Sequence, residues 1–266
     1  MFITSCSDKK EENKNEIVTE PKTENKEEIS KDENRDSLIL LQNFYDSIRL
    51  VDFRKNAFRL ANEPITKRIK TEIYEDGKVV VFQNVEKFLY IKFDVASWKQ
   101  KTEFYNVRDS IPNLVWEETW EGSNFLGDTI RDINGDNQLD ILTNFYPSSG
   151  CCRRNSFWIR LFDTQNRKFA EKIRMINPTF YPEEKIVRGI NYGHPGEVPI
   201  YKMKWRGIRL DTVEYIHPFP KEKGKFLITK KYEIYPQRQL PPKGKIIYSL
   251  PKEYEDIESI EWFLDY

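Results

Sequence analysis

The spacing of apolar residues changes twice along the chain. Residues 7–36 consist almost entirely of Lys, Glu, Asn, Asp, Thr and Ser, and they contain no aromatic residue. From Ser37 onward apolar residues recur every three or four positions, as in Leu38, Leu41, Tyr45 and Ile48. This period is typical of an amphipathic helix, and Ser37 is a suitable N-cap. The sequence therefore predicts a polar tether over 7–36 and one N-terminal helix that packs on a sheet.

From about Thr66 the apolar residues alternate with polar ones, which is the period of half-buried strands. Short strands are separated by turn residues, for example Glu75-Asp76-Gly77-Lys78, where the pattern indicates a hairpin. The strands expected first are 69–74, 79–82, 88–95, 104–107 and 114–120. The fold class expected is mainly β, an antiparallel meander or sandwich with a small propeller as a variant, forming one β-rich domain over 37–266.

Composition agrees with a polar tail joined to an aromatic-rich core. The 266 residues are 32% charged and 14% aromatic, and the mean hydropathy is -0.72. Lys and Arg number 43, as do Asp and Glu, so no net field favours nucleic acid as a partner. No stretch of the sequence is long and apolar enough to predict a membrane-spanning helix.

The N-terminal residues Ile3-Thr4-Ser5-Cys6 resemble the end of a bacterial lipoprotein signal, in which the cysteine receives the lipid. The basic region and most of the apolar region of such a signal are missing before Cys6. A lipid on Cys6 followed by a hydrophilic tether would suit a domain anchored outside the cytoplasm. Residues 1–6 are therefore interpreted as a signal remnant, with localisation at the membrane, in the periplasm or on the cell surface. The alternative is a chance cysteine in a cytoplasmic protein.

Between two apolar segments lies a nine-residue stretch of the form D-x-N-x-D-x-x-x-D. Calcium binds six to eight oxygen ligands, and a tight loop can supply most of them. The expected ligands are three side chains, one backbone carbonyl and a closing carboxylate, from Asp132, Asn134, Asp136, Gln138 and Asp140 in that order. Gly135 and Asn137 are residue types that tolerate the positive φ such a turn requires. The alternative is an Asp/Asn/Gly-rich hairpin turn that binds no metal.

Two adjacent cysteines, Cys151 and Cys152, follow this loop. If Cys6 carries lipid, these two are the even number expected in an oxidising compartment, so a structural disulfide is favoured over catalysis. Whether they pair with each other stays open. The neighbouring Arg153 and Arg154 are interpreted as solvated or charge-neutralising.

Further candidates for chemistry are few. His194 and His217 lie near glycine or proline and lack a nearby nucleophile or second ligand, so both are interpreted as loop histidines. Trp116-Glu117-Glu118-Thr119-Trp120 alternates aromatic rings and carboxylates. It is interpreted as core or rim packing, with a sugar-stacking face that carries acid and base carboxylates as the alternative.

The run D-I-N-G-D-N-Q-L-D-I-L-T resembles the calcium loop of integrin-type FG-GAP and VCBS repeat proteins. The longer stretch from Thr129 to Ile216 is loosely similar to periplasmic lysozyme-inhibitor-like β proteins. These resemblances imply that Asp132, Asn134, Asp136 and Asp140 hold Ca²⁺, and they imply no catalytic motif.

The expected function is a lipid-anchored, calcium-stabilised, non-enzymatic domain that binds an envelope protein or glycan, in the manner of an inhibitor. The alternative is an enzyme that binds or hydrolyses envelope polysaccharide with Glu117 and Glu118.

Overall fold

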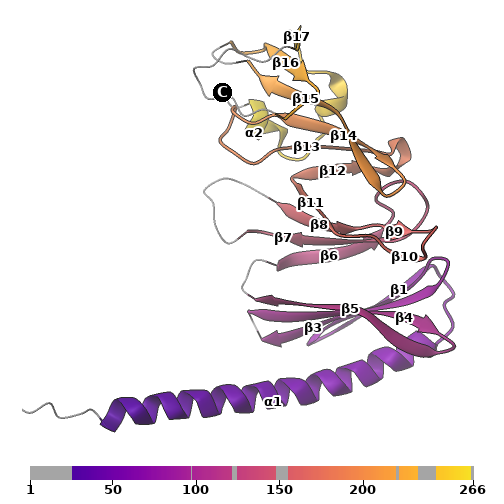
Figure 1. The fold of residues 1–266 in the computed structure, drawn as a ribbon, viewed down its shortest axis with the longest axis vertical. Helices are drawn as coiled ribbons and strands as arrows, with labels where there is room; N and C mark the ends of the chain where they lie inside the picture. Colours follow the sequence, from indigo (N-terminus) through magenta and orange to yellow (C-terminus); the bar gives the residue numbers. More distant parts are fainter. Residues whose placement is uncertain are drawn as a thin grey trace, which may run out of the picture. The chain divides into compact units, whose positions relative to one another are not determined.

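The computed structural model describes residues 26–96, 98–121, 125–147, 155–219, 222–232 and 244–264, with the backbone alone at 26–34 and 96. The chain forms two compact units, 1–48 and 49–266. The fold is mainly β with antiparallel sheets and one long N-terminal helix, as the apolar pattern predicts, and the described strands form no closed barrel (Figure 1).

Helix α1 spans Lys26–Asn62, so the predicted start at Ser37 is wrong. The stretch from Lys26 to Asp36, which the sequence assigned to the tether, is helical. Glu and Lys are good helix formers, and Glu27 and Lys31 have the i,i+4 spacing that supports a helix without any apolar face. The low hydrophobicity of this segment means that it cannot contribute to an apolar core, but it can still form a helix. The tether expected before residue 26 lies outside the described residues.

The first sheet is a five-stranded antiparallel meander in which each strand pairs with the next along the chain. Its strands are β1 (Ile69–Tyr74), β2 (Gly77–Gln83), β3 (Lys87–Ala96), β4 (Lys99–Arg108) and β5 (Ile111–Glu121). The predicted hairpin at Asp76-Gly77 is present, with Tyr74 opposite Gly77.

The second sheet has four antiparallel strands in the order β11-β8-β7-β6, so β11 and β6 are its edges. Its strands are β6 (Phe125–Arg131), β7 (Asp140–Phe145), β8 (Ser156–Arg160) and β11 (Ile173–Ile176). A separate short hairpin is formed by β9 (Phe162–Asp163) and β10 (Lys168–Phe169).

The third sheet contains six antiparallel strands in chain order. They are β12 (Pro178–Tyr181), β13 (Ile186–Ile190), β14 (Ile200–Arg206), β15 (Arg209–Pro218), β16 (Phe226–Thr229) and β17 (Lys245–Ile247). Short helices η1 (Pro182–Glu184), η2 (Lys252–Tyr254) and α2 (Ile260–Leu264) complete the fold. The last described element of the chain is helix α2.

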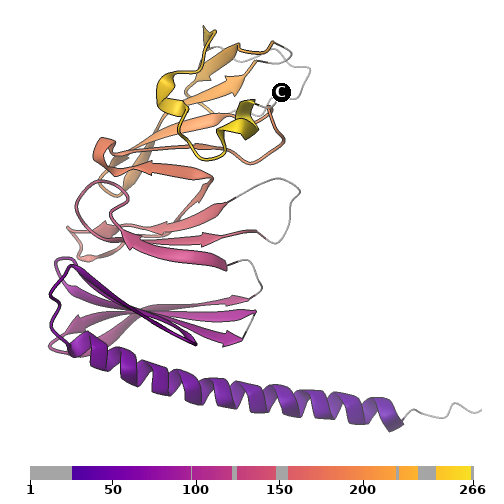
Figure 2. The same ribbon diagram turned by 180° about the vertical axis from the view of Figure 1, so that it is seen from behind.

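Within residues 49–266 the three sheets follow one another as layers (Figures 1 and 2). Four apolar clusters join these layers. The end of α1 packs on the first sheet through Leu50, Phe53, Ala57, Leu60 and Ala61. Phe82, Phe88, Phe104 and Phe162 lie in the cluster between the first and second sheets. A third cluster joins the second sheet to the third, and a fourth joins the third sheet to the C-terminal segment. Each sheet is thus covered on both faces. This is expected because successive side chains of a strand point to opposite faces, and here both faces carry apolar residues.

An ion pair reinforces the contact between α1 and the first sheet. Arg54 donates from Nε to Oε2 of Glu103 over 2.7 Å, and its second nitrogen pairs with Oε1. Burial alone would raise the pKa of Glu103, but its hydrogen bonds with Arg54 and Tyr105 outweigh burial and lower that pKa. The carboxylate of Glu103 is thereby kept charged although it is 1% exposed.

Candidate functional site

The D-x-N-x-D loop joins β6 to β7, so the predicted strand–loop–strand arrangement is confirmed. Gly135 and Asn137 have positive φ values of 74° and 63°, as their residue types suggested. A side chain at position 135 would also collide with the backbone, because an added Cβ would lie 1.9 Å from the carbonyl oxygen of Pro182. The tight turn therefore depends on glycine at this position.

Backbone amides close this loop through the oxygens of Asp132, Asn134 and Asp136. Asp132 accepts hydrogen bonds from the amides of Gly135 at 2.7 Å and Asn137 at 2.8 Å, one on each carboxylate oxygen. The amide nitrogen of Asp136 donates to Oδ1 of Asn134 over 3.2 Å. Oδ1 of Asp136 accepts from the amide of Gln138 over 2.8 Å. The loop therefore has the hydrogen-bond pattern of Asx turns, in which side-chain oxygens bind nearby backbone N–H groups.

Asp140 is the first residue of β7 and has no exposed surface. Oδ2 accepts from the amide of Ile133 and Oδ1 from the amide of Phe162, each over 2.9 Å. The pKa of Asp140 is raised to about 7. Burial is the main cause and outweighs the two hydrogen bonds, which lower the pKa, and the charges of Asp136 and Asp132 add to the effect of burial. The carboxylate thus connects the loop, the start of β7 and the start of β9.

The donor types in this loop suit calcium. Among the described residues no three Asp, Glu, His or Cys side chains come together in a way that could hold a metal ion. Nδ2 of Asn134 donates to Oδ2 of Asp136 and to the carbonyl oxygen of Gly207, both over 3.1 Å. The side-chain amide of Asn134 thus connects Asp136 to the backbone at Gly207. Calcium binding by Asp132, Asn134, Asp136, Gln138 and Asp140 stays a prediction.

Glu117 and Glu118 do not form a catalytic pair. They are neighbours in β5, and successive strand residues point to opposite faces of a sheet. Glu117 pairs with Lys101 of β4 at 2.9 Å. Glu118 instead pairs with Lys172 at 2.9 Å and Arg160 at 3.5 Å, next to the second sheet. Two carboxylates on opposite faces cannot act on one glycosidic bond.

The aromatic residues of this region form a row between the first and second sheets, here called the aromatic row: Trp116, Trp120, Phe145 and Trp158. Trp116 stacks on Phe104 at 5.6 Å, and the guanidinium of Arg160 lies 4.5 Å from its ring centre. Trp158 stacks on Phe145 at 5.7 Å, with Nζ of Lys172 at 4.6 Å from its ring centre. Because side chains of the protein already contact these rings, the row serves packing better than it would serve a sugar platform.

The two histidines lie in different environments. His194 is in an exposed loop, as predicted. His217 lies in β15 with no exposed surface, so its interpretation as a loop histidine is wrong. The turn signal of the following Pro218 was misleading because Pro218 is itself the last residue of the strand. Nε2 of His217 lies 3.1 Å from Oγ1 of Thr229. Burial lowers the pKa of His217 to about 4, although a backbone hydrogen bond at Lys231 acts in the opposite direction.

Sequence reasoning missed a groove beside the edge strand β11. The groove has a volume of about 640 Å³ and its apolar wall consists of Ile173, Met175, Tyr201, Met203, Ile208 and Leu210. Arg174, Arg209, Asp211 and Asn191 supply polar groups to the same groove. We call this feature the β11 groove. Its residues come from β11, which ends at Ile176, from the hairpin of β14 and β15, which begins at Ile200, and from Asn191 between them, so no local spacing connects them. The alternation Ile173-Arg174-Met175 is the only local signal, and it indicates no more than a strand.

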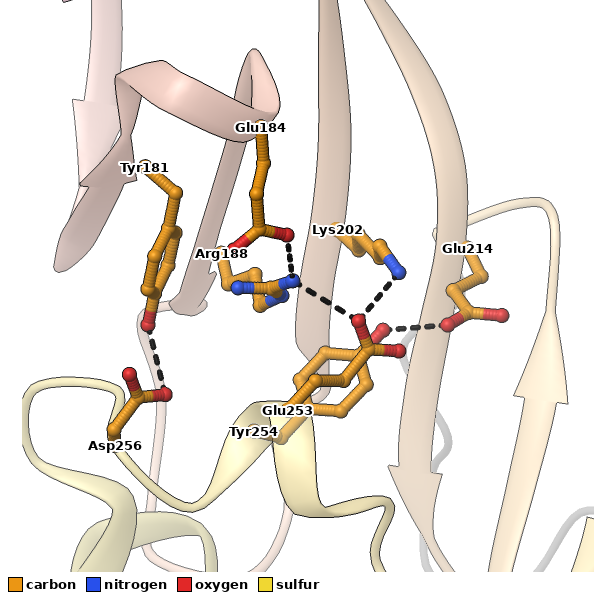
Figure 3. A network of polar contacts seen from close by, with 8 residues as sticks. All are labelled: Tyr181, Glu184, Arg188, Lys202, Glu214, Glu253, Tyr254 and Asp256. Atoms are coloured by element: carbon orange, nitrogen blue, oxygen red, sulfur yellow. Dashed lines mark hydrogen bonds and ion pairs between the residues drawn. The ribbon is translucent and has the colours of Figure 1, made fainter.

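A polar network attaches η2 to the third sheet (Figure 3). Arg188 of β13 is 3% exposed and donates to Glu184 at 2.8 Å and to Glu253 at 2.9 Å. Lys202 donates to the same oxygen of Glu253 over 2.7 Å, and the Tyr254 hydroxyl donates to Glu214 over 2.5 Å. Because this network connects strands β13, β14 and β15 to one C-terminal turn, its role is to hold that turn in place.

Several predicted residues lie outside the described part of the chain. These are Cys6 with its lipid, Cys151 and Cys152 with their disulfide, and Arg153 and Arg154. Among the described helices none has a stretch long and apolar enough to span a bilayer.

Comparison with protein families, with curated proteins and with solved structures finds no match to this chain. The similarities to FG-GAP loops and to lysozyme-inhibitor-like proteins therefore stay predictions that rest on the sequence motifs alone.

Proposed function

We propose that this chain is a non-enzymatic binding domain at the bacterial cell envelope, anchored by lipid on Cys6. Its ligand is an extended peptide segment of a partner protein that lies along β11 in the β11 groove. One observation carries the proposal: β11 is an edge strand of the second sheet and at the same time one wall of a groove of about 640 Å³.

The edge position of β11 favours recognition by strand addition. β11 pairs with β8 on one side, and it is the last strand of its sheet on the other. An edge strand presents backbone N–H and C=O groups that an extended peptide can pair with. The Tyr201 hydroxyl donates to the carbonyl oxygen of Ile176 over 2.8 Å and so blocks the end of the strand. A docked peptide would therefore pair with residues 173–175.

The side chains of the groove indicate the kind of peptide. In an added strand every second side chain would point toward the apolar wall formed by Met175, Met203 and Leu210. Methionine side chains adapt to different apolar partners, which suits peptide binding. Arg209 gives the groove positive charge, whereas Asp211 is paired with Arg206 at 2.7 Å and the guanidinium of Arg174 lies over Phe145 and Trp158. We therefore expect a peptide with alternating apolar residues and at least one acidic residue.

The rival function, hydrolysis of envelope polysaccharide, has weaker support. Glu117 and Glu118 lie on opposite faces of β5, and ion pairs engage both. The rings of the aromatic row contact one another or a neighbouring cation. A hydrolase would show glycan turnover that Glu117→Gln or Glu118→Gln abolishes, and we expect no turnover.

The test is selection from a displayed library of random peptides on the full chain. Selected peptides should bind the wild type, and Met203→Arg or Leu210→Arg should weaken binding at least about tenfold, because a buried cation would disrupt the apolar wall. The matched control is Leu126→Arg in β6, the opposite edge strand of the same sheet, where the side chain is 53% exposed. The proposal fails if no peptide is enriched, or if the enriched peptides bind Met203→Arg and Leu210→Arg as tightly as the wild type. Folding of each variant is checked by its melting temperature.

Two further parts of the proposal have their own tests. Labelled fatty acid should attach to the protein in bacterial cells and should be absent from Cys6→Ser. An inhibitor-like role would be seen as inhibition of a lysozyme-type hydrolase by the purified chain, with Met203→Arg as the inactive control.

A further inference from the structure

A cluster of exposed apolar side chains lies on the part of α1 that belongs to the first unit. Leu40 is 69% exposed, Phe44 61% and Ile48 45%. Leu38, Leu41 and Tyr45 are each more than half exposed as well. Single exposed apolar residues are common on protein surfaces, but a contiguous group on one helix marks an interaction surface.

These residues form a stripe along the helix. Leu41, Phe44 and Ile48 follow one another at intervals of three and four, so they line one side of an α-helix, with Leu40 and Tyr45 beside them. The residues of α1 that are buried on the first sheet, such as Leu50, Phe53 and Ala57, have a different helical phase, about half a turn away. The exposed stripe is therefore a separate surface and does not extend the face that packs on the sheet.

We infer that this stripe docks on the same stripe of a second copy of the chain, forming a homodimer through paired helices. The spacing of Leu41, Phe44 and Ile48 is the a/d spacing of a two-helix seam. A two-fold interface needs a self-complementary patch, and an uncharged apolar stripe meets a copy of itself without like-charge contacts.

The area of the stripe supports a dimer of this kind. Six side chains that each expose on the order of 100 Å² would together bury about 600 Å² per copy, or about 1,200 Å² in the pair. That total is at the lower limit of a specific protein–protein interface, so the dimer should be reversible and depend on concentration. An isolated helix is also marginal in water, and pairing would stabilise this part of α1.

Charge argues against a lipid surface as the occupant. The polar residues between Leu38 and Ile48 are Gln42, Asn43, Asp46 and Ser47, with no lysine or arginine among them. Helices that lie on anionic membranes carry basic residues on their polar face.

The test is sedimentation equilibrium of the full chain over concentrations from about 1 to about 100 µM, a range that reveals a weak dimer by mass action. The wild type should change from monomer to dimer across this range. Phe44→Glu and Ile48→Glu should each raise the dissociation constant at least about tenfold, because they place charge at the centre of the seam. Asn43→Glu adds the same charge next to Phe44 but away from the stripe, and it should still dimerise.

A wild type that stays monomeric at every concentration overturns the inference, and so does a dimer that Phe44→Glu and Ile48→Glu leave intact. Vesicles of phosphatidylglycerol provide the competing outcome: binding that Phe44→Glu abolishes would assign the stripe to membrane and not to a second copy. Circular dichroism shows that each variant keeps its secondary structure. Peptide binding at the β11 groove is measured separately, so either proposal can fail without the other.

Discussion

The carboxylate of Asp140 accepts a hydrogen bond over 2.9 Å from the backbone amide of Phe162, a residue 22 positions further along the chain. Its other oxygen accepts from the amide of Ile133, also over 2.9 Å. One side chain without exposed surface thus holds the loop before β7 and the hairpin after β8 together. The aspartate that closes the D-x-N-x-D motif therefore has a structural role in connecting these two segments.

The first prediction concerns Asp140→Asn. Asparagine offers one carbonyl oxygen, so its amide group would face the N–H of Ile133 or Phe162 and leave one buried donor unpaired. We expect the free energy of unfolding to fall by about 1–3 kcal/mol in urea denaturation. The control is Asp211→Asn, which removes an exposed ion pair with Arg206 and should cost less than about 1 kcal/mol. Equal losses in the two variants would contradict the role assigned to Asp140.

The second prediction separates the two interpretations of the loop through Asp136→Asn. The new carbonyl oxygen can still accept from the amide of Gln138, and the loss of the hydrogen bond from Nδ2 of Asn134 is offset because the repulsion from Asp132 is removed. In chelator we therefore expect the stability to change by less than about 0.5 kcal/mol. If calcium binds as the motif predicts, Ca²⁺ raises the melting temperature of the wild type, and Asp136→Asn lacks most of that rise.

The outcome in calcium decides between the interpretations. If the wild type melts at the same temperature in calcium and in chelator, the loop is a turn closed by backbone amides and binds no calcium. A rise that Asp136→Asn retains in full would place the ion elsewhere on the protein.

The third prediction is a pH dependence from His217. Its pKa in the folded protein, about 4, lies below the ordinary value of 6.5, so the unfolded chain binds a proton more readily. Protonation of His217 in the unfolded chain therefore does not affect the free energy of unfolding above about pH 6.5. As the pH falls from 6.5 toward 4, this protonation favours the unfolded chain and lowers the free energy of unfolding. The total loss should be on the order of 3 kcal/mol, since each pKa unit corresponds to about 1.4 kcal/mol.

The measurement is the slope of unfolding free energy against pH between 6.5 and 4. His217→Gln should lower this slope relative to the wild type, whatever its effect on stability at neutral pH. The comparison with the wild type is needed because the raised pKa of Asp140 acts in the opposite direction over the same pH range. An unchanged slope in His217→Gln would mean that other groups cause the acid sensitivity.

Local patterns in the sequence were sufficient to predict most strands but not the sheets to which they belong. The alternation around Gly77 and along β3 and β5 identified these strands, because the period of two depends only on which face is buried. The division into three sheets depends on packing between faces, for example of Phe88 on Phe162, and no local spacing encodes it. The same holds for the β11 groove, where Met175 and Met203 meet only after folding.

The D-x-N-x-D motif was ambiguous for a chemical reason. Aspartate and asparagine oxygens bind calcium, and the same oxygens accept hydrogen bonds from backbone amides in tight turns. Residue types and spacing are thus alike in both cases, and the backbone hydrogen bonds accepted by Asp132 and Asp136 are compatible with either one. The buried state of His217 could not be predicted either, because Pro218 beside it is a turn signal in most contexts.

Each of the three sheets is built from one continuous stretch of chain: 69–121, 125–176 and 178–247. During synthesis on a ribosome, the first sheet can therefore form before the second has been translated. Its inner face, with Phe82, Phe88 and Phe104, then stays uncovered until Phe162 and Phe169 have emerged. The interval between translation of residues 121 and 169 is when the nascent chain most needs a chaperone, and when aggregation in overexpressing cells would begin.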